Sequence, residues 1–282
     1  MSVHRPLLFS VAYNMLGDRS EAEDVVQNVL LRWEQSSKTD IANEQAYLVK
    51  STMNAAINEL NSARRRRRTY PNIWLPEPLP EDMARGAAPD GETRTMLTYE
   101  LMVLVRELSP AELAVFVLKE AFNYSHEEIA EILEKRPDHC RQLLKRARDK
   151  IRNLHPDPHV PAEPDLKLAG EVVDAIVQGD VERLMGLLTP DVRLMADGGG
   201  KVAAAASPTV GVERVAHLLT TAARKAGFVP RIEVTTLNGQ PGFIAYNAHQ
   251  PVAAYILTAF GGKVGRMYVI LNPDKLAVFQ KS

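Results

Sequence analysis

Apolar residues recur at helical spacing along the first 68 positions. Between residues 22 and 33 they fall on one side of a helix, and residues 24, 27 and 31 fall on the other. This spacing predicts an amphipathic helix with one buried side. Ser20 and Glu23 have the spacing of a capping box, so we expect the helix to begin there. A second helix is predicted over residues 45–66. The apolar stripe of the first helix comprises Ala22, Val25, Val26, Val29, Leu30 and Trp33.

A proline-rich stretch follows over residues 69–95. Because prolines fix the backbone and lack an N–H group, this stretch predicts an irregular linker. It nevertheless holds the apolar cluster Ile73, Trp74 and Leu75. A freely exposed linker does not need a tryptophan, so we expect the string WLPEP at residues 74–78 to be buried.

Helical spacing returns over residues 96–155, with capping boxes predicted at residues 109–112 and 125–128. The second box opens a short helix, and residues 134–137 lead into a long one. This order, with an outward face rich in Arg, Gln and Lys, is typical of a helix-turn-helix. Such a face could contact DNA, or it could be the solvated side of an ordinary helix pair. The long helix has the buried stripe Cys140, Leu143, Leu144, Ala147, Ile151 and Leu154, and the outward face Asp138, Arg141, Gln142, Lys145 and Arg146.

After a joint rich in proline at residues 156–164, the pattern changes. Helices come first, with one short strand among them, and four strands follow, with turns at Asn238-Gly239 and Gly261-Gly262. This order predicts an α+β domain over residues 165–282, with helices on one face of a curved antiparallel sheet. The predicted helices are residues 165–178, one ending at 188, and 212–226; the predicted strands are residues 192–195, 231–237, 243–246, 252–260 and 263–271.

Composition and charge narrow the class of protein. The chain has 282 residues, 45% of them hydrophobic and 24% charged, which suits a folded protein of several domains. A single cysteine, Cys140, excludes a disulfide framework, and no apolar run is long enough for a membrane span, so we expect a cytoplasmic protein. The net charge is −1, yet residues 64–68 are all arginine and residues 135–152 hold eight basic and two acidic side chains. Two basic concentrations predict two contacts with a polyanion, although an arginine run can also be a solvated helix end.

The chain resembles the sigma-70 family of bacterial RNA polymerase specificity subunits, in its extracytoplasmic-function (ECF) group. AYNMLGDRSEAEDVVQNVLLRW, followed by AYLVKSTMNAAINELNSARRRR, resembles sigma domain 2, and LSPAELAVFVLKEAFNYSHEEIAEIL with the next helix resembles sigma domain 4. The C-terminal part is similar to SnoaL-like domains of the NTF2/ketosteroid-isomerase superfamily. One ECF subgroup has this extension and the marker strings WLPEP, DGGGK and NPDKL, all present here. The resemblance implies a multi-domain protein with sigma domain 2 (residues 1–68), a linker (69–95), a helix-turn-helix sigma domain 4 (96–155), a joint (156–164) and an α+β SnoaL/NTF2-like domain (165–282), the first two domains being all-α.

The resemblance also implies a function, which is to direct core RNA polymerase to specific promoters and start transcription. One helix face would dock on the largest polymerase subunits, and the loop 36–45 with the next helix would engage melted −10 DNA. The arginine run would contact phosphates, and the long helix would read the −35 element. The residues implied are Asp24, Gln27 and Leu31 for polymerase; Asn54, Asn58, Arg64, Arg65, Arg66 and Arg67 for the −10 element; and Asp138, Arg141, Gln142, Lys145 and Arg146 for the −35 element.

The marker strings imply regulation within the chain. We expect the C-terminal domain to contact the linker and sigma domain 2, and to hold the DNA-binding domains in an unsuitable geometry until polymerase binding shifts the balance. The residues implied are Trp74, Leu75, Pro76, Glu77 and Pro78; Asp197, Gly198, Gly199, Gly200 and Lys201; and Asn272, Pro273, Asp274, Lys275 and Leu276.

A second class of function is open at this point. The SnoaL-like domain could be a small-ligand receptor or an enzyme that the first half of the chain delivers to DNA. Such domains have a cavity in most relatives, but sequence cannot show that polar residues converge on it, and fold analogy is not a sufficient argument for catalysis. We therefore expect no enzymatic activity and no cofactor. The residues that could reach the cavity are Asp197, His217, Tyr246, His249 and Tyr255.

Three other features carry little chemistry. The string GGGK lacks the rest of a phosphate-binding loop. His155 and His159 have no further ligands beside them, so we expect no metal site. Cys140 lies on the buried stripe, which favours packing over a redox role.

Overall fold

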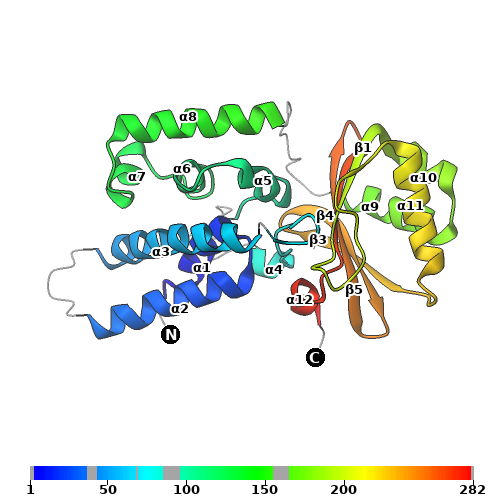
Figure 1. Ribbon diagram of the computed structural model, residues 1–282, viewed down its shortest axis with the longest axis horizontal. Coiled ribbons are helices and arrows are strands. Elements are labelled where there is room, and N and C mark those ends of the chain that lie inside the picture. Colours follow the sequence, from blue (N-terminus) through cyan, green and yellow to red (C-terminus); the bar gives the residue numbers. More distant parts are fainter. Residues whose placement is uncertain (1–2, 37–42, 68, 85–95, 155–164, 281–282) are drawn as a thin grey trace. The chain divides into compact units, whose positions relative to one another are not determined.

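The computed structural model describes residues 3–36, 43–67, 69–84, 96–154 and 165–280 (Figure 1). The chain forms two compact units. One comprises residues 1–68 and 85–159, and the other comprises residues 69–84 and 160–282. The linker residues 69–84 therefore belong to the same unit as the C-terminal domain, although in sequence they lie between the two sigma-like domains.

The first unit is helical throughout its described parts. Helices α1, α2 and α3 pack on one another, and α1 and α3 also contact α6. Helices α7 and α8 form the expected helix-turn-helix, and both pack against α6. The bounds are α1 (Arg5–Leu16), α2 (Arg19–Gln35), α3 (Glu44–Arg67), α5 (Tyr99–Leu104), η2 (Val105–Glu107), α6 (Pro110–Glu120), α7 (His126–Ile132) and α8 (Pro137–Leu154).

Helix starts follow the predicted capping chemistry in two cases of three. The capping boxes at residues 109–112 and 125–128 are confirmed. The box expected at Ser20 and Glu23 is wrong, because Asp18 caps α2 by accepting a hydrogen bond from the Glu21 N–H at 3.0 Å. Glu23 instead pairs with Arg19, four residues earlier on the helix surface, at 2.8 Å.

The buried stripe of α8 is shorter than predicted. Its first five members are buried, and burial raises the pKa of the Cys140 thiol. Leu154 is 44% exposed, because it is the last residue of the helix. Within the described part of the chain, no helix combines the length and apolar character that crossing a bilayer requires.

A six-stranded sheet forms the centre of the second unit, in the order β2-β1-β6-β5-β4-β3. The pairing is antiparallel except between β1 and β6, which run parallel. The predicted antiparallel sheet is thus mixed: short turns dictate the direction of β3 to β6, but β1 precedes α11 and no turn sets its direction. The bounds are α4 (Glu81–Ala84), α9 (Leu166–Gln178), α10 (Val181–Leu187), β1 (Leu188–Asp197), β2 (Thr209–Val210), α11 (Val212–Lys225), β3 (Arg231–Leu237), β4 (Gln240–Asn247), β5 (Gln250–Phe260), β6 (Lys263–Ile270), α12 (Pro273–Leu276) and η3 (Ala277–Phe279).

Both faces of this sheet are covered. Helices α9, α10 and α11 lie on one side, and α4 and α12 lie on the other (Figure 1). Phe243 belongs to the apolar cluster under the helices, and the next residue, Ile244, points to the opposite face and is also buried. The prediction of helices over one face of the sheet is confirmed, and the linker side adds a second cover.

Candidate functional site

The carboxylate of Asp197, the last residue of β1, is fully buried. Its Oδ1 accepts hydrogen bonds from the Tyr70 hydroxyl at 2.6 Å and from the Gly199 N–H at 2.9 Å. Its Oδ2 accepts from the Leu75 N–H at 3.0 Å and from Lys275 Nζ at 2.7 Å. A buried carboxylate is costly unless it is paired and hydrogen-bonded, and these four donors meet that need. Each of the three marker strings therefore supplies a group at one carboxylate.

Lys275 reaches this carboxylate from α12. Its side chain is buried, and Nζ also donates to the carbonyl oxygen of Leu75. Nζ lies 4.2 Å from the centroid of the Trp74 ring and 5.6 Å from that of Tyr70. Cation–π attraction grows when water is excluded, so two aromatic rings of the linker stabilise this ammonium group. We call Tyr70, Trp74, Leu75, Asp197 and Lys275 the Asp197 cluster.

Tyr70 acts in this cluster as a neutral donor. Burial, and then the hydrogen bond to Asp197, holds the pKa of Tyr70 well above its ordinary value. The amide of Asn272 also donates to the Tyr70 oxygen at 3.3 Å. The phenol therefore joins the linker to β1 and to the residue that caps α12.

Close packing explains the three glycines of DGGGK. A Cβ on Gly198 would lie 2.0 Å from a carbonyl oxygen of the same loop. On Gly199 it would lie 2.4 Å from the Asn272 side chain, and on Gly200 it would lie 2.8 Å from Pro71 in the linker. Gly199 and Gly200 also have φ angles of +64° and +71°, which glycine adopts without strain. The loop is therefore shaped to accept the linker and α12.

A second contact holds the linker further along. The Leu79 N–H donates to Asn238 Oδ1 at 2.7 Å, and the Asn238 N–H donates to the Leu79 carbonyl at 3.1 Å. Asn238 belongs to the turn between β3 and β4, and Pro80 forms a β-bridge with Leu237 beside it. The linker thus extends the edge of the sheet. The burial expected for WLPEP is confirmed, because Leu75, Pro76, Glu77 and Pro78 are buried and Trp74 is half-buried.

The other marker residues have smaller parts. Lys201 pairs with Asp274 at 2.7 Å, and both side chains are exposed. Pro273 opens α12, and Leu276 is buried. The contact expected between the C-terminal domain and sigma domain 2 concerns two different units and stays a prediction.

The residues expected to bind polymerase lie together on α2. Asp24, Gln27 and Leu31 are exposed, and the Leu31 side chain is 47% exposed. An apolar side chain on an open helix face suits a docking surface, although single exposed apolar residues are common.

The two asparagines expected at the −10 element are exposed on α3. Asn58 lines a cavity of about 280 Å³ between α2 and α3, together with Asn28 and Arg32. No sequence pattern pointed to Asn28 and Arg32, because they lie on α2 and only the packing of α2 on α3 brings them beside Asn58. Of the loop expected to bind the same element, residues 37–42 lie outside the described residues.

The arginine run is largely engaged within the first unit. Arg66 donates to one oxygen of Glu21 at 2.5 Å, and Arg67 donates to the other at 3.1 Å. Arg65 is exposed, and Arg68 lies outside the described residues. The run is therefore not simply a solvated helix end.

Arg64 joins the two parts of the first unit. Its guanidinium donates to the backbone carbonyls of Arg106 and Leu108, which precede α6. In addition, the Leu97 N–H donates to Asn14 Oδ1 at 2.9 Å. The helices of residues 3–67 and those of residues 96–154 are thus held together by polar contacts that no sequence pattern indicated.

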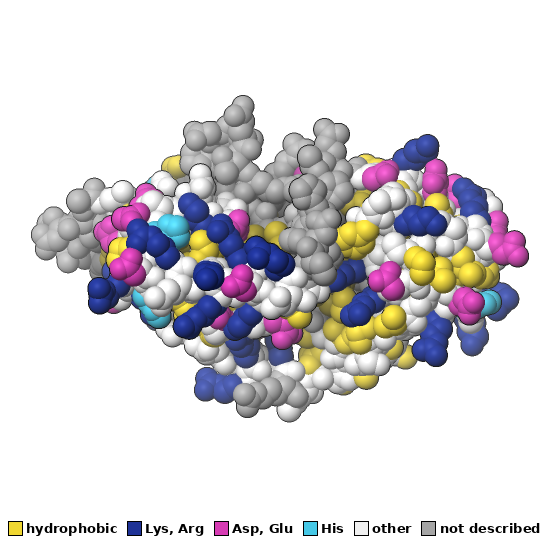
Figure 2. Space-filling model, turned by 90° about the horizontal axis from the view of Figure 1, so that it is seen from above, with side chains coloured by type: hydrophobic (Ala, Val, Ile, Leu, Met, Phe, Trp, Pro, Cys, Tyr) yellow, Lys and Arg dark blue, Asp and Glu magenta, His cyan; other side chains and the backbone are white. Residues whose placement is uncertain are grey.

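The outward face of α8 is open to solvent. Asp138, Arg141, Gln142, Lys145 and Arg146 are all exposed. Figure 2 looks down on this helix and shows Lys and Arg side chains gathered over it, with acidic side chains interspersed among them. Long cationic and amide side chains on an exposed helix can reach phosphates and base edges in a major groove.

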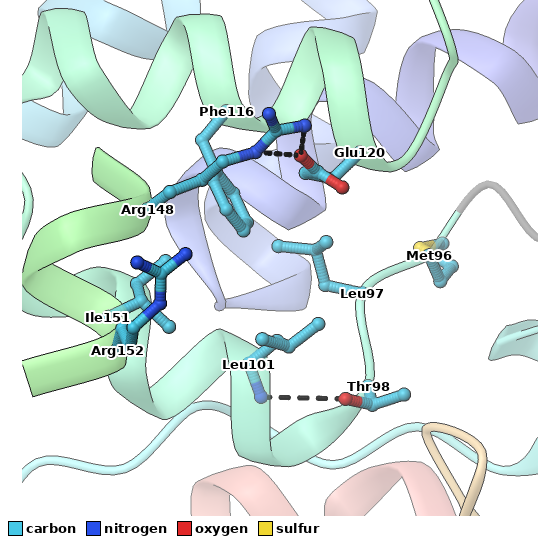
Figure 3. A pocket seen from close by; sticks show the side chains of 9 residues that line it. All are labelled: Met96, Leu97, Thr98, Leu101, Phe116, Glu120, Arg148, Ile151 and Arg152. Carbon is cyan, nitrogen blue, oxygen red and sulfur yellow. Dashed lines mark hydrogen bonds and ion pairs between the residues drawn. The ribbon is translucent and has the colours of Figure 1, made fainter. Parts of the chain in front are cut away.

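The helices of residues 96–154 also line a cavity on another side, of about 390 Å³ (Figure 3). Arg148 lies at this cavity and donates to Glu120 from Nε at 3.0 Å. Its lining mixes apolar and charged side chains, and it comprises Met96, Leu97, Thr98, Leu101, Phe116, Glu120, Arg148, Ile151 and Arg152.

The residues weighed for a ligand or catalytic site occupy different surroundings. The Asp197 carboxylate is committed to the linker. Tyr255 stacks on Phe243, and burial raises its pKa to about 12. The guanidinium of Arg231 lies over the Tyr246 ring. His217 and His249 are exposed, and His155 and His159 lie outside the described residues.

Comparison with known proteins decides the family. The family model of sigma-70 region 2 matches residues 1–66, and that of sigma-70 region 4 matches residues 99–151. The chain is 32% identical to the ECF RNA polymerase sigma factor SigJ of Mycobacterium tuberculosis, over 96% of this chain and 90% of that protein. This chain belongs to the ECF RNA polymerase sigma factors.

The similarity of this ECF sigma factor to known proteins extends through its C-terminal domain. The crystal structure of M. tuberculosis SigJ matches with a TM-score of 0.74 and 28% identity, and the match covers 96% of this chain and 95% of that one. A probable ECF sigma factor of the same organism, SigI, is 27% identical over 97% of this chain and 92% of the relative. The predicted architecture of two sigma domains and a C-terminal α+β domain is confirmed. As a sigma factor, the protein directs core RNA polymerase to promoters and starts transcription.

Proposed function

We propose that the C-terminal α+β domain regulates this sigma factor in cis by capturing the linker between sigma domains 2 and 4. The observation that carries the proposal is the Asp197 carboxylate, which accepts hydrogen bonds from two linker groups, the Tyr70 hydroxyl and the Leu75 N–H.

Capture of the linker limits how far the two DNA-binding domains can separate. The whole linker, residues 69–95, has 27 residues and could span at most about 95 Å when fully extended. While residues 69–84 are held on the α+β domain, only the 11 residues 85–95 can extend, over at most about 40 Å. A sigma factor must contact two separated promoter elements at once. Release of residues 69–84 would therefore favour promoter binding.

The Asp197 cluster suits a switch between two states. Exposed ion pairs are weak, but removing one partner of a buried pair leaves a charge that is neither solvated nor compensated. The pair of Lys275 and Asp197 is therefore either intact with the linker bound, or broken when the linker leaves. Polymerase and promoter DNA would shift the balance only by binding the released state more tightly.

The packing of domains 2 and 4 adds to the same control. Arg64 donates to backbone carbonyls beside α6, and Arg67 pairs with Glu21. We propose that Arg64 holds the domains together in the free protein and reaches DNA phosphates after they separate, whereas the Arg67 pair lies within domain 2. Arg65, which is exposed, can reach phosphates in either state.

The remaining surfaces would serve initiation. Asp24, Gln27 and Leu31 would bind the largest subunits of core polymerase in the cytoplasm, and the asparagines of α3 would hold unstacked −10 bases. The outward face of α8 would read the −35 element. The remaining alternative, a ligand receptor or enzyme, gains no support from the described residues, because its five candidates occupy separate surroundings.

Run-off transcription with core polymerase tests the proposal, on the DNA upstream of the protein's own gene. We would compare the full chain, residues 1–164, and Asp197→Asn, with Asp274→Asn as a matched control at an exposed ion pair. Both the truncation and Asp197→Asn should change transcript yield, and Asp274→Asn should not. Because truncation uncovers Leu75 and Leu79, the point variant is the stronger comparison. Equal yield and equal affinity for polymerase from Asp197→Asn and the full chain would refute regulation by linker capture.

A further inference from the structure

Two carboxylates hold the guanidinium of Arg141 in place. On its own helix, α8, Asp138 accepts a hydrogen bond from Arg141 at 2.6 Å. From the preceding helix, α7, Glu127 accepts another at 3.0 Å. The arginine on the proposed DNA face is thus fixed from both helices of the helix-turn-helix.

Capping of α7 does not require Glu127. The start of α7 is already capped by Ser125 and Glu128, which satisfy each other's backbone N–H groups. The pair between Glu127 and Arg141 is exposed, so it contributes little to folding. A carboxylate beside a DNA-binding face also repels phosphates, which lowers affinity for any DNA sequence. Glu127 therefore lowers the affinity for DNA, and a role for this residue must be sought in another property of binding.

That property is the orientation of the Arg141 guanidinium. Arginine has a flexible side chain and a planar group with fixed donor directions, and it reads guanine through two parallel hydrogen bonds to O6 and N7. Contacts with phosphates tolerate many orientations, but a bidentate contact with a base does not. A side chain held before binding loses less freedom when it forms such a contact.

We propose that Glu127 is a positioning residue that sets the base preference of Arg141 at the −35 element. The inference rests on the proposed reading of that element by α8. Asp138 acts from the other side, and it can itself accept a hydrogen bond from a cytosine amino group. Glu127 needs no contact with DNA to have this effect.

Selection of promoters by the holoenzyme tests the proposal. Full-length variants are combined with core polymerase and allowed to select from a pool of randomised duplexes, and the bound sequences are read. The variants are Arg141→Ala, Glu127→Gln, the double variant, and Glu131→Gln. Glu131 is the matched control, because it is exposed one turn further along α7 and its substitution removes the same charge.

Arg141→Ala should flatten the base preference at the positions that this side chain reads. Glu127→Gln should weaken the preference at the same positions, by about threefold or more, while raising affinity for unrelated DNA. The double variant should match Arg141→Ala, and Glu131→Gln should raise affinity without changing any preference. If Arg141→Ala has a clear effect and Glu127→Gln leaves the base preferences unchanged, the role of Glu127 is overturned while the reading of DNA by Arg141 stands. No effect of Arg141→Ala would overturn the reading of DNA by this side chain, and the inference with it.

Discussion

The hydroxyl of Tyr70 donates a hydrogen bond of 2.6 Å to Asp197, a residue 127 positions later in the chain. One partner lies in the linker between the two DNA-binding domains, and the other ends the first strand of the C-terminal domain. Because of this hydrogen bond and those around it, residues 69–84, which in sequence look like a simple linker, fold as part of the C-terminal domain.

Removal of the buried ammonium group should destabilise the second unit. Lys275→Met leaves the Asp197 carboxylate without its counter-charge, and breaking a buried pair in this way costs about 3–5 kcal/mol. Urea unfolding in a Trp33→Phe background, followed by the fluorescence of Trp74, measures this loss in the unit that holds the linker. Lys201→Met, at an exposed pair, should change stability by only about 0–1 kcal/mol. Combining Lys275→Met with Asp197→Asn should recover part of the loss, and a double variant no better than Lys275→Met would argue against the pairing.

Stability should fall in alkali partly through Tyr70. The folded protein holds the pKa of Tyr70 above its ordinary value of 10.0. The folded state therefore keeps this proton when the unfolded state has lost it, so stability is full below about pH 10 and declines as the pH rises further. Tyr70→Phe should be less stable near neutral pH, by about 1 kcal/mol for the lost hydrogen bond, but its decline above pH 10 should be shallower. Tyr255 contributes equally in both proteins, so the difference between their unfolding curves at pH 9 to 11 isolates Tyr70. Parallel curves would mean that Tyr70 is not held as described.

A methyl group at Gly200 should loosen the linker. The added Cβ would lie 2.8 Å from Pro71, and the φ angle of +71° adds strain. Gly262→Ala carries similar strain at a φ of +76°, but nothing lies within 4 Å of its Cβ position. Both variants should lose about 1 kcal/mol from backbone strain. Only Gly200→Ala should alter run-off transcription and make the linker more sensitive to limited proteolysis. The same sensitivity in both variants would show that backbone strain, not the contact with Pro71, is responsible.

Neighbouring arginines should behave differently. Arg64→Ala removes a charged donor to two backbone carbonyls and should reduce stability by about 1.5–3 kcal/mol. Arg65→Ala should leave stability within about 0.5 kcal/mol, because that side chain is exposed. It should instead weaken promoter binding and reduce the salt dependence of binding by about one counterion. Thermal unfolding and binding titrations at several salt concentrations measure the two effects, and identical behaviour of both variants would contradict the division of roles.

A charge on the exposed face of α2 should block assembly with polymerase. Leu31→Asp places a carboxylate where we expect an apolar contact, and it should weaken binding to core polymerase at least about tenfold, or 1.4 kcal/mol. The fold should be unaffected, because Leu31 is 47% exposed. Leu218→Asp, at a leucine that is 42% exposed on α11, is the control and should bind as the full chain does. Fluorescence anisotropy with labelled protein gives both affinities.

Local chemistry in the sequence was enough to predict most elements. The capping boxes of α6 and α7, Gly179 after α9, and the turns Asn238-Gly239 and Gly261-Gly262 each act within a few residues, and each is where the pattern indicates. Asp18 was missed because Ser20 and Glu23 offer the same spacing two residues later. Strand β4 is longer than predicted, since it is buried on both faces and lacks the alternation that marks a strand.

The contacts of the candidate site were beyond the reach of local patterns. The marker strings pointed to the residues of the Asp197 cluster only through resemblance, and nothing in them shows which atom meets which. In the sequence, Arg64 is one of five consecutive arginines. Only the packing of α3 beside α6 shows that its guanidinium donates hydrogen bonds to backbone carbonyl oxygens. The contact of Arg141 with Glu127 depends in the same way on the angle between two helices.

Residues 69–84 belong to the second unit, while the chain on either side of them belongs to the first. The polypeptide therefore passes between the two bodies at three places rather than one. A protease that cuts the chain between residues 155 and 164 would leave the α+β domain attached to the rest of the protein through residues 69–84, which fold with that domain. Nicked protein should consequently migrate as a single species until it is denatured, and a separately expressed tail should be able to rejoin the remainder.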